Sequence, residues 1–124
     1  MNSHEPPHFD AADLGSRLSG MPDAELDELP FGVVEMDHGA VVLRYNATES
    51  RYSGLPRERV VGRQFFRDVA PCSNNRHVAE RFTLDALDET IAYTFSLRMK
   101  PVAVTLRMLK AADGGPMYLV VRWK

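Results

Sequence analysis

The stretch 31-FGVVEMDHGAVVLRYN-46 decides the fold. Its two halves, residues 31–37 and 40–46, are rich in β-branched and aromatic side chains, which favour strands. The segment between them carries an aspartate and a glycine, which is typical of a hairpin turn. The stretch therefore predicts two antiparallel strands joined by a tight turn.

Three more strands are predicted at the C-terminal end of the chain. Residues 91–99, 102–109 and 117–123 are again β-rich, and apolar and polar side chains alternate in the last two, as on a strand with one buried face. Asp113-Gly114-Gly115 predicts the turn of the final hairpin.

Helical patterns separate these two blocks of strands. Short helical segments are predicted between residues 47 and 70, and an amphipathic stripe predicts a helix over residues 76–88. Two blocks of antiparallel strands separated by helices exclude a doubly wound βαβ fold. We expect an α+β fold of the PAS type: a five-stranded antiparallel sheet flanked by short helices that cover one face.

The first 28 residues are expected to form a separate N-terminal piece. Residues 1–8 contain two consecutive prolines and predict a loose arm. Apolar residues at helical spacing predict a helix over residues 9–19, and an initial proline followed by acidic residues predicts another over 22–29. The predicted organisation is an N-terminal arm and helical cap over 1–28 and a PAS core over 29–124.

Composition and charge exclude several classes of function. A length of 124 residues fits one domain, and a net charge of −2 without a basic cluster argues against nucleic-acid binding. No run of 18 apolar residues predicts a membrane span, and the polar N-terminus predicts no signal peptide. We therefore expect a cytoplasmic location, no nucleic acid and no membrane among its partners.

Cys72 is the only cysteine of the chain. A single thiol in a reducing compartment excludes a disulfide framework, a CxxC redox motif and a cysteine-rich zinc site. It is either a small buried hydrophobic residue or an attachment point. No constellation specific to an enzyme accompanies it, so no catalytic residue and no metal ligand is predicted.

Tyr45 and Glu49 form a second candidate pair, in 45-YNATESRYS-53. Tyr45 ends a predicted strand and Glu49 follows four residues later in a predicted helix. Residues at this spacing share one side of a helix, so the two polar groups could point at the same atom. The alternative is that Glu49 is a solvated helix residue.

These two motifs together resemble the photoactive yellow protein family. The matching stretches extend from Leu26 to Lys124, and the run 68-DVAPC-72 is the most specific of them. They are LPFGVVEMD (29–37), LRYNATES (43–50), VVGRQFFRDVAPC (60–72) and YTFSLRMKP (93–101). The resemblance implies a PAS-fold blue-light receptor.

The resemblance also implies a cofactor and the residues that hold it. It is p-coumaric acid (4-hydroxycinnamic acid), bound as a thioester to Cys72, with hydrogen bonds from Tyr45 and Glu49 to its phenolate. Ser53 stands where a threonine supports the site tyrosine. Leu55 replaces an arginine over the phenolate, and Leu97 replaces a tyrosine. The implied pocket residues are Val34, Leu55, Phe65, Ala70, Pro71, Phe95, Leu97 and Met99.

The mechanism that the resemblance implies is a switch. Light isomerises the chromophore double bond, Glu49 gives its proton to the phenolate, and a carboxylate remains in a low-dielectric pocket. Because such a charge is costly, we expect the N-terminal helices over 9–29 to be released. The signal is expected to pass to a separate, unknown signalling protein, and the chain to be a monomer or weak homodimer.

Two other functions remain open at this point. One is a PAS ligand-binding or dimerisation module without the chromophore. The other is a redox sensor in which Cys72 is oxidised reversibly, which requires an exposed thiol of low pKa. The apolar approach 65-FFRDVAP-71 favours a sheltered thiol and so argues against the redox sensor.

Overall fold

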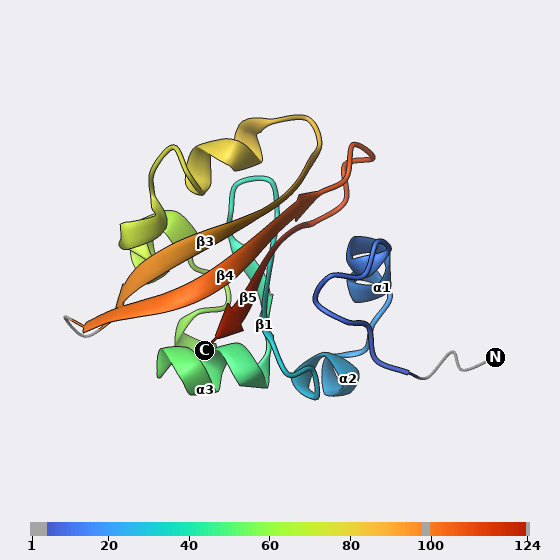
Figure 1. Cartoon of the computed structure of the whole chain (residues 1–124), viewed down its shortest axis with the longest axis horizontal. Helices are drawn as coiled ribbons and strands as arrows, with labels where there is room; N and C mark the ends of the chain where they lie inside the picture. The colour runs from blue at the N-terminus through green and yellow to red at the C-terminus, as the bar shows by residue number, and fades with distance from the viewer. Residues whose placement is uncertain (1–4, 98–99, 124) are drawn as a thin grey trace.

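The computed structural model describes residues 5–97 and 100–123 (Figure 1). They contain one five-stranded antiparallel sheet with the order β2-β1-β5-β4-β3. The strands are β1 Gly32–Met36, β2 Val42–Tyr45, β3 Leu87–Leu97, β4 Lys100–Lys110 and β5 Met117–Trp123. The predicted five-stranded antiparallel sheet is confirmed.

The first and last strands of the chain are neighbours in the centre of the sheet. Gly32 of β1 lies opposite Val121 of β5, and Val34 lies opposite Tyr45 across the β1–β2 hairpin. The end of β5, including Trp123, therefore lies beside the start of β1. This is the region where the candidate site is found.

The helix predicted over residues 76–88 is wrong. Only η4, a 3-10 turn over Ala79–Thr83, is helical, and the backbone at Val78 has φ −124° and ψ −71°, outside the helical region. Leu87 already belongs to β3, where it lies opposite Lys110. The inter-strand hydrogen bonds and the burial of Leu87 against the sheet favour the strand. The helical pattern is weaker, because it rests on few apolar residues.

The N-terminal helices are present but shorter than predicted. α1 Leu14–Ser19 lies within the predicted range 9–19, and α2 Asp23–Asp27 lies within 22–29. Of the predicted loose arm, residues 5–8 are described and contain neither helix nor strand.

The segment between β2 and β3 consists mostly of tight helical turns. One α-helix, α3 Ala47–Ser53, follows β2 directly. After it come η1 Arg57–Arg59, the π-helical turn η2 Phe65–Val69, η3 Pro71–Ser73 and η4. The short helical segments predicted before residue 70 are confirmed in kind, although most are 3-10 or π turns.

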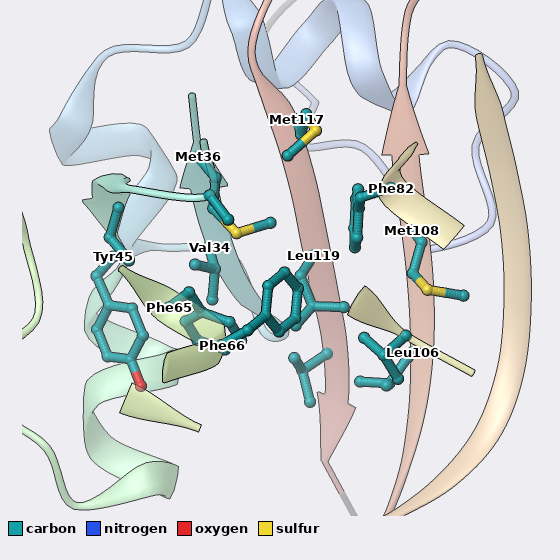
Figure 2. Close-up of a cluster of buried hydrophobic side chains, with 14 of the residues drawn as sticks. Val34, Met36, Tyr45, Phe65, Phe66, Phe82, Leu106, Met108, Met117 and Leu119 are labelled. Atoms are coloured by element: carbon teal, nitrogen blue, oxygen red, sulfur yellow. The ribbon is translucent and has the colours of Figure 1, made fainter. Parts of the chain in front are cut away.

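The central strands β1 and β5 are covered on both faces of the sheet, whereas helices were expected over one face. On one face, Val34 and Leu119 pack with Phe65 and Phe66 from η2 in the cluster shown in Figure 2. The opposite face has its own cluster, which joins the cap to the sheet. Its members are Phe9, Leu14, Leu18, Leu26, Leu29, Phe31, Val33, Leu109, Tyr118 and Val120. Cap and core therefore share one hydrophobic cluster.

Candidate functional site

Glu49 and Ser53 lie on the helix α3, whose local sequence explains where it begins and ends. Asn46 is the N-cap, with its side-chain oxygen accepting a hydrogen bond from the main-chain N–H of Glu49 at 3.0 Å. Gly54 ends the helix at φ +76°, a left-handed conformation that glycine adopts readily. Tyr45 immediately precedes Asn46, so strand β2 and helix α3 meet at this point.

Glu49 is buried, with 3% of its surface exposed. Its Oε1 accepts a 2.7 Å hydrogen bond from the indole Nε1–H of Trp123. Burial raises the pKa of Glu49 to about 8, although the Trp123 bond acts in the opposite direction. The carboxyl is therefore mostly protonated at neutral pH and can donate a hydrogen bond.

Gly32 makes room for this carboxyl. A Cβ at this position would lie 1.8 Å from Oε1 of Glu49, far inside van der Waals contact. A glycine in the central strand β1 therefore lets the Glu49 side chain lie directly against the sheet.

Tyr45 is buried in the core cluster, with 2% of its surface exposed (Figure 2). Burial raises the pKa of its phenol, and the nearby charge of Glu49 raises it further. Its hydroxyl donates to Oγ of Ser53 at 2.9 Å, and the same Oγ accepts from the main-chain N–H of Leu55 at 3.2 Å. Since Ser53 keeps its own proton, it can donate to Tyr45 when the Tyr45 hydroxyl turns toward another acceptor.

Cys72 lies on η3, in a turn fixed by hydrogen bonds to its main chain. Its carbonyl oxygen accepts from the Tyr93 hydroxyl at 2.7 Å and from Nδ2 of Asn75 at 3.1 Å. The thiol side chain is half-buried and packs against the same cluster that contains Tyr45. The attachment candidate and the buried hydroxyl thus contact one core.

The other predicted pocket residues differ in their burial. Val34, Phe65 and Phe95 are buried members of this cluster, while Leu55 and Ala70 are half-buried and pack against it. Pro71 is exposed. Met99 and the side chain of Leu97 lie outside what the structure describes. The pocket assignment stays a prediction for all of them.

Trp123 is the residue at this site that sequence reasoning missed. Its ring stacks on Tyr52 from α3, with centroids 5.5 Å apart and planes at 9°, and lies 5.8 Å from the ring of Phe95. No local sequence signal marks it, because only the pairing of β5 with β1 brings residue 123 to the Glu49 side chain.

The helix α3 is also hydrogen-bonded to the N-terminal cap. Asn46 Nδ2 donates to the carbonyl oxygens of Leu26 at 2.9 Å and Phe31 at 3.1 Å. Asp27 accepts from the main-chain N–H of Ala47 at 2.8 Å. Movement of α3 would therefore disturb the cap directly.

The buried carboxyl predicts a pH-dependent stability. Since the pKa of Glu49 is about 8 in the folded protein and about 4.3 in the unfolded chain, the folded state binds more protons between these values. Stability should fall as pH rises from about 4.5 to 8, by at most about 1.4 kcal/mol per pH unit. Glu49→Gln should lose this slope. Urea denaturation of both proteins at pH 5, 6, 7 and 8 measures it, and parallel profiles would contradict the assignment.

Neither a metal centre nor a membrane span is found in the described part of the chain. No group of three or more His, Cys, Asp and Glu residues there could hold a metal ion. None of its helices is long and apolar enough to cross a bilayer.

Known proteins resemble this chain over most of its length. Residues 20–124 match the family model of the PAS fold. The chain is 34% identical over 119 residues to the photoactive yellow protein of Halochromatium salexigens, which covers 93% of this chain and 95% of that protein. It is 30% identical over 118 residues to that of Rhodothalassium salexigens, covering 92% and 94%.

A solved structure agrees with these relatives. The photoactive yellow protein domain of the sensor histidine kinase Ppr from Rhodospirillum centenum matches with a TM-score of 0.80 at 41% identity, covering 86% of this chain and 97% of that domain. Fold and family model together define a PAS-fold protein. Within that class, the chain belongs to the photoactive yellow protein family, which confirms the resemblance inferred from the sequence.

Proposed function

We propose that this protein is a blue-light receptor that carries p-coumaric acid as a thioester on Cys72. The observation that carries the proposal is the buried pair Tyr45 and Glu49, of which Tyr45 belongs to the core cluster against which the only cysteine packs. The residues fit such a group: a buried phenolate requires hydrogen-bond donors, and this site offers a phenol and a protonated carboxyl.

When bound, the p-coumaroyl group supplies absorption of blue light and a double bond that isomerises. The chain's own residues bind and orient it. The Cys72 thiolate would attack the carbonyl carbon of an activated p-coumaric acid and form the S–C bond as the activating group leaves. Tyr45 and Glu49 would then each donate a hydrogen bond to the phenolate oxygen, with Ser53 supporting Tyr45.

Signalling would begin with the proton of Glu49. Giving up this proton to the phenolate would leave Glu49 as a carboxylate in a buried site, at a cost of several kcal/mol. That cost is comparable with the roughly 5–15 kcal/mol stability of a small domain. The hydrogen bonds that Asn46 and Ala47 make to Leu26 and Asp27 supply a direct route from α3 to the cap. We therefore propose that the cap over 1–28 detaches from the core over 29–124.

The partner and location follow the same proposal. The similar domain in a sensor histidine kinase supports a role in signal transduction. We propose that the chain itself is not an enzyme, that it acts in the cytoplasm, and that its partner is a separate signalling protein.

An absorption spectrum with an intact mass tests the chromophore. The protein is incubated with activated p-coumaric acid, and the expected result is a visible band with a mass increase of one coumaroyl group, mapped to Cys72 by peptide analysis. The band should bleach in blue light and recover in the dark. A folded protein without adduct or colour would overturn the proposal and favour a PAS ligand-binding module.

A further inference from the structure

Three elements fix the ring of Trp123 beside Glu49. Trp123 is the last residue of β5, where it lies opposite Val104 of β4. Its ring is stacked on Tyr52 from α3 at 5.5 Å and lies 5.8 Å from Phe95 of β3. Aromatic contacts of this kind restrict the orientation of a ring, so the indole N–H has a defined direction.

The hydrogen bond from Trp123 makes the two carboxyl oxygens of Glu49 unequal. An indole N–H can donate but not accept, so Oε1, at 2.7 Å, must act as an acceptor. A protonated carboxyl in this arrangement therefore carries its proton on Oε2. No hydrogen bond to Oε2 is formed by the described residues, 5–97 and 100–123.

We propose that Trp123 is a positioning residue for the proton transfer from Glu49. The inference rests on the proposed function and deepens it. Trp123 holds Oε1, which leaves Oε2–H as the donor that would be available to the phenolate of a bound group. Oε2 would then be the atom that gives up the proton, and Glu49 would take the negative charge.

The same bond has a second role after the transfer. It becomes a charge-assisted hydrogen bond from Trp123 to the new carboxylate, which is stronger than a bond to the neutral acid. Trp123 thus orients the donor before the transfer and stabilises the carboxylate afterwards, which lengthens the life of the signalling state.

Trp123→Phe tests the bond, because phenylalanine keeps an aromatic ring and loses the donor. The first readout uses the protein without chromophore: the infrared C=O stretch of protonated Glu49, assigned by its absence in Glu49→Gln. Loss of the bond should shift this band to higher frequency and raise the midpoint of its pH titration by about 1–2 units. Tyr45 is the other titratable group known to face this carboxyl, so the titration is repeated in Tyr45→Phe.

A second substitution covers the case that phenylalanine disturbs the packing. Trp123 is the only tryptophan of the chain, so biosynthetic labelling with the analogue that has sulfur in place of the indole N–H changes this site alone. The analogue keeps the size and shape of the ring. It should reproduce the infrared shift and the higher midpoint.

In the loaded protein, Trp123→Phe should shorten the signalling state by about tenfold, because the carboxylate loses a charge-assisted bond. In a Glu49→Gln background the same substitution should change the recovery rate little. An unchanged Glu49 band and midpoint, with phenylalanine and with the analogue, would overturn the inference. Failure to form the adduct is detected separately, by mass. It would overturn the proposed function independently of the measurements on Trp123.

Discussion

Cys72→Ala is expected to abolish the covalent adduct and the visible colour while the protein stays folded. The chain has no second cysteine, so no other thiol can form the thioester. The turn around Cys72 is held through its main-chain carbonyl by Tyr93 and Asn75, and alanine keeps both contacts. Stability should therefore change by less than about 1 kcal/mol, as for most substitutions outside the core. Intact mass, absorption and urea denaturation measure the three quantities.

Tyr45→Phe is the matched control for the loss of colour. It keeps the thiol and should form an adduct of the same mass, with a shifted absorption band because the phenolate loses one donor. Colour in Cys72→Ala, or an adduct on another side chain, would contradict the assignment. Equal non-covalent binding of p-coumaric acid by the parent and Cys72→Ala would instead favour a PAS ligand-binding module.

The strands could be predicted from the sequence because their signal is local. The hairpin over 31–46 has β-rich halves around a glycine turn, and the structure contains both of its strands. The prediction of a helix over 76–88 failed because the structure of this segment depends on a strand that is distant in the sequence. Leu87 gains inter-strand hydrogen bonds from β4, and no residue within 76–88 indicates that this pairing will form.

The cover over the second face of the sheet leaves a signal in the sequence. The runs GVVEM in β1 and MYLVV in β5 are buried at every position, rather than at alternate ones. A continuous apolar run marks a strand with both faces covered. Since Val33 and Val34 point to opposite faces, their joint burial requires a layer on each side, and the cap is that second layer.

In the candidate site, too, some residues could be predicted from local sequence and others could not. Tyr45 and Glu49 could be found because a strand end and the first turn of a helix are adjacent in the chain. Trp123 could not, because its contact with Glu49 spans 74 positions and depends on β5 lying beside β1. The role of Gly32 likewise could not be predicted, because a glycine is required there to make room for the Glu49 side chain and not to form a turn.

Arg44 forms a polar link between the sheet and the cap. It lies opposite Glu35 in the β1–β2 hairpin, and its guanidinium donates to both carboxylate oxygens of Glu35 at 2.9 Å. It also donates to the carbonyl oxygens of Leu18 at 2.9 Å and Met21 at 2.6 Å in the cap. Tyr118, opposite Glu35 on the other side, donates to the same carboxylate at 2.7 Å. One side chain thus joins a buried ion pair to two cap carbonyls.

Arg44→Met should therefore destabilise the protein strongly and loosen the cap. The side chains of Arg44 and Glu35 are only 20% and 10% exposed, so removing the arginine leaves a largely buried carboxylate with the Tyr118 donor alone. Breaking a buried pair in this way costs about 3–5 kcal/mol. Urea denaturation measures the loss, and faster amide hydrogen exchange over residues 9–29 reports the release of the cap.

Two further variants distinguish the effect of leaving a buried charge unpaired from the effect of losing any contact with the cap. Arg57→Met breaks another ion pair to the cap, with Asp27, but these side chains are 41% and 30% exposed, so it should cost at most about 1 kcal/mol. Arg44→Met with Glu35→Gln removes the stranded charge and leaves an amide oxygen for Tyr118, so it should recover part of the lost stability. If Arg44→Met were as mild as Arg57→Met, the ion pair would not hold the cap. Its attachment would then rest on its other contacts with the core, such as the shared hydrophobic cluster and the hydrogen bonds from Arg107 to the carbonyl oxygens of Phe9 and Ala11.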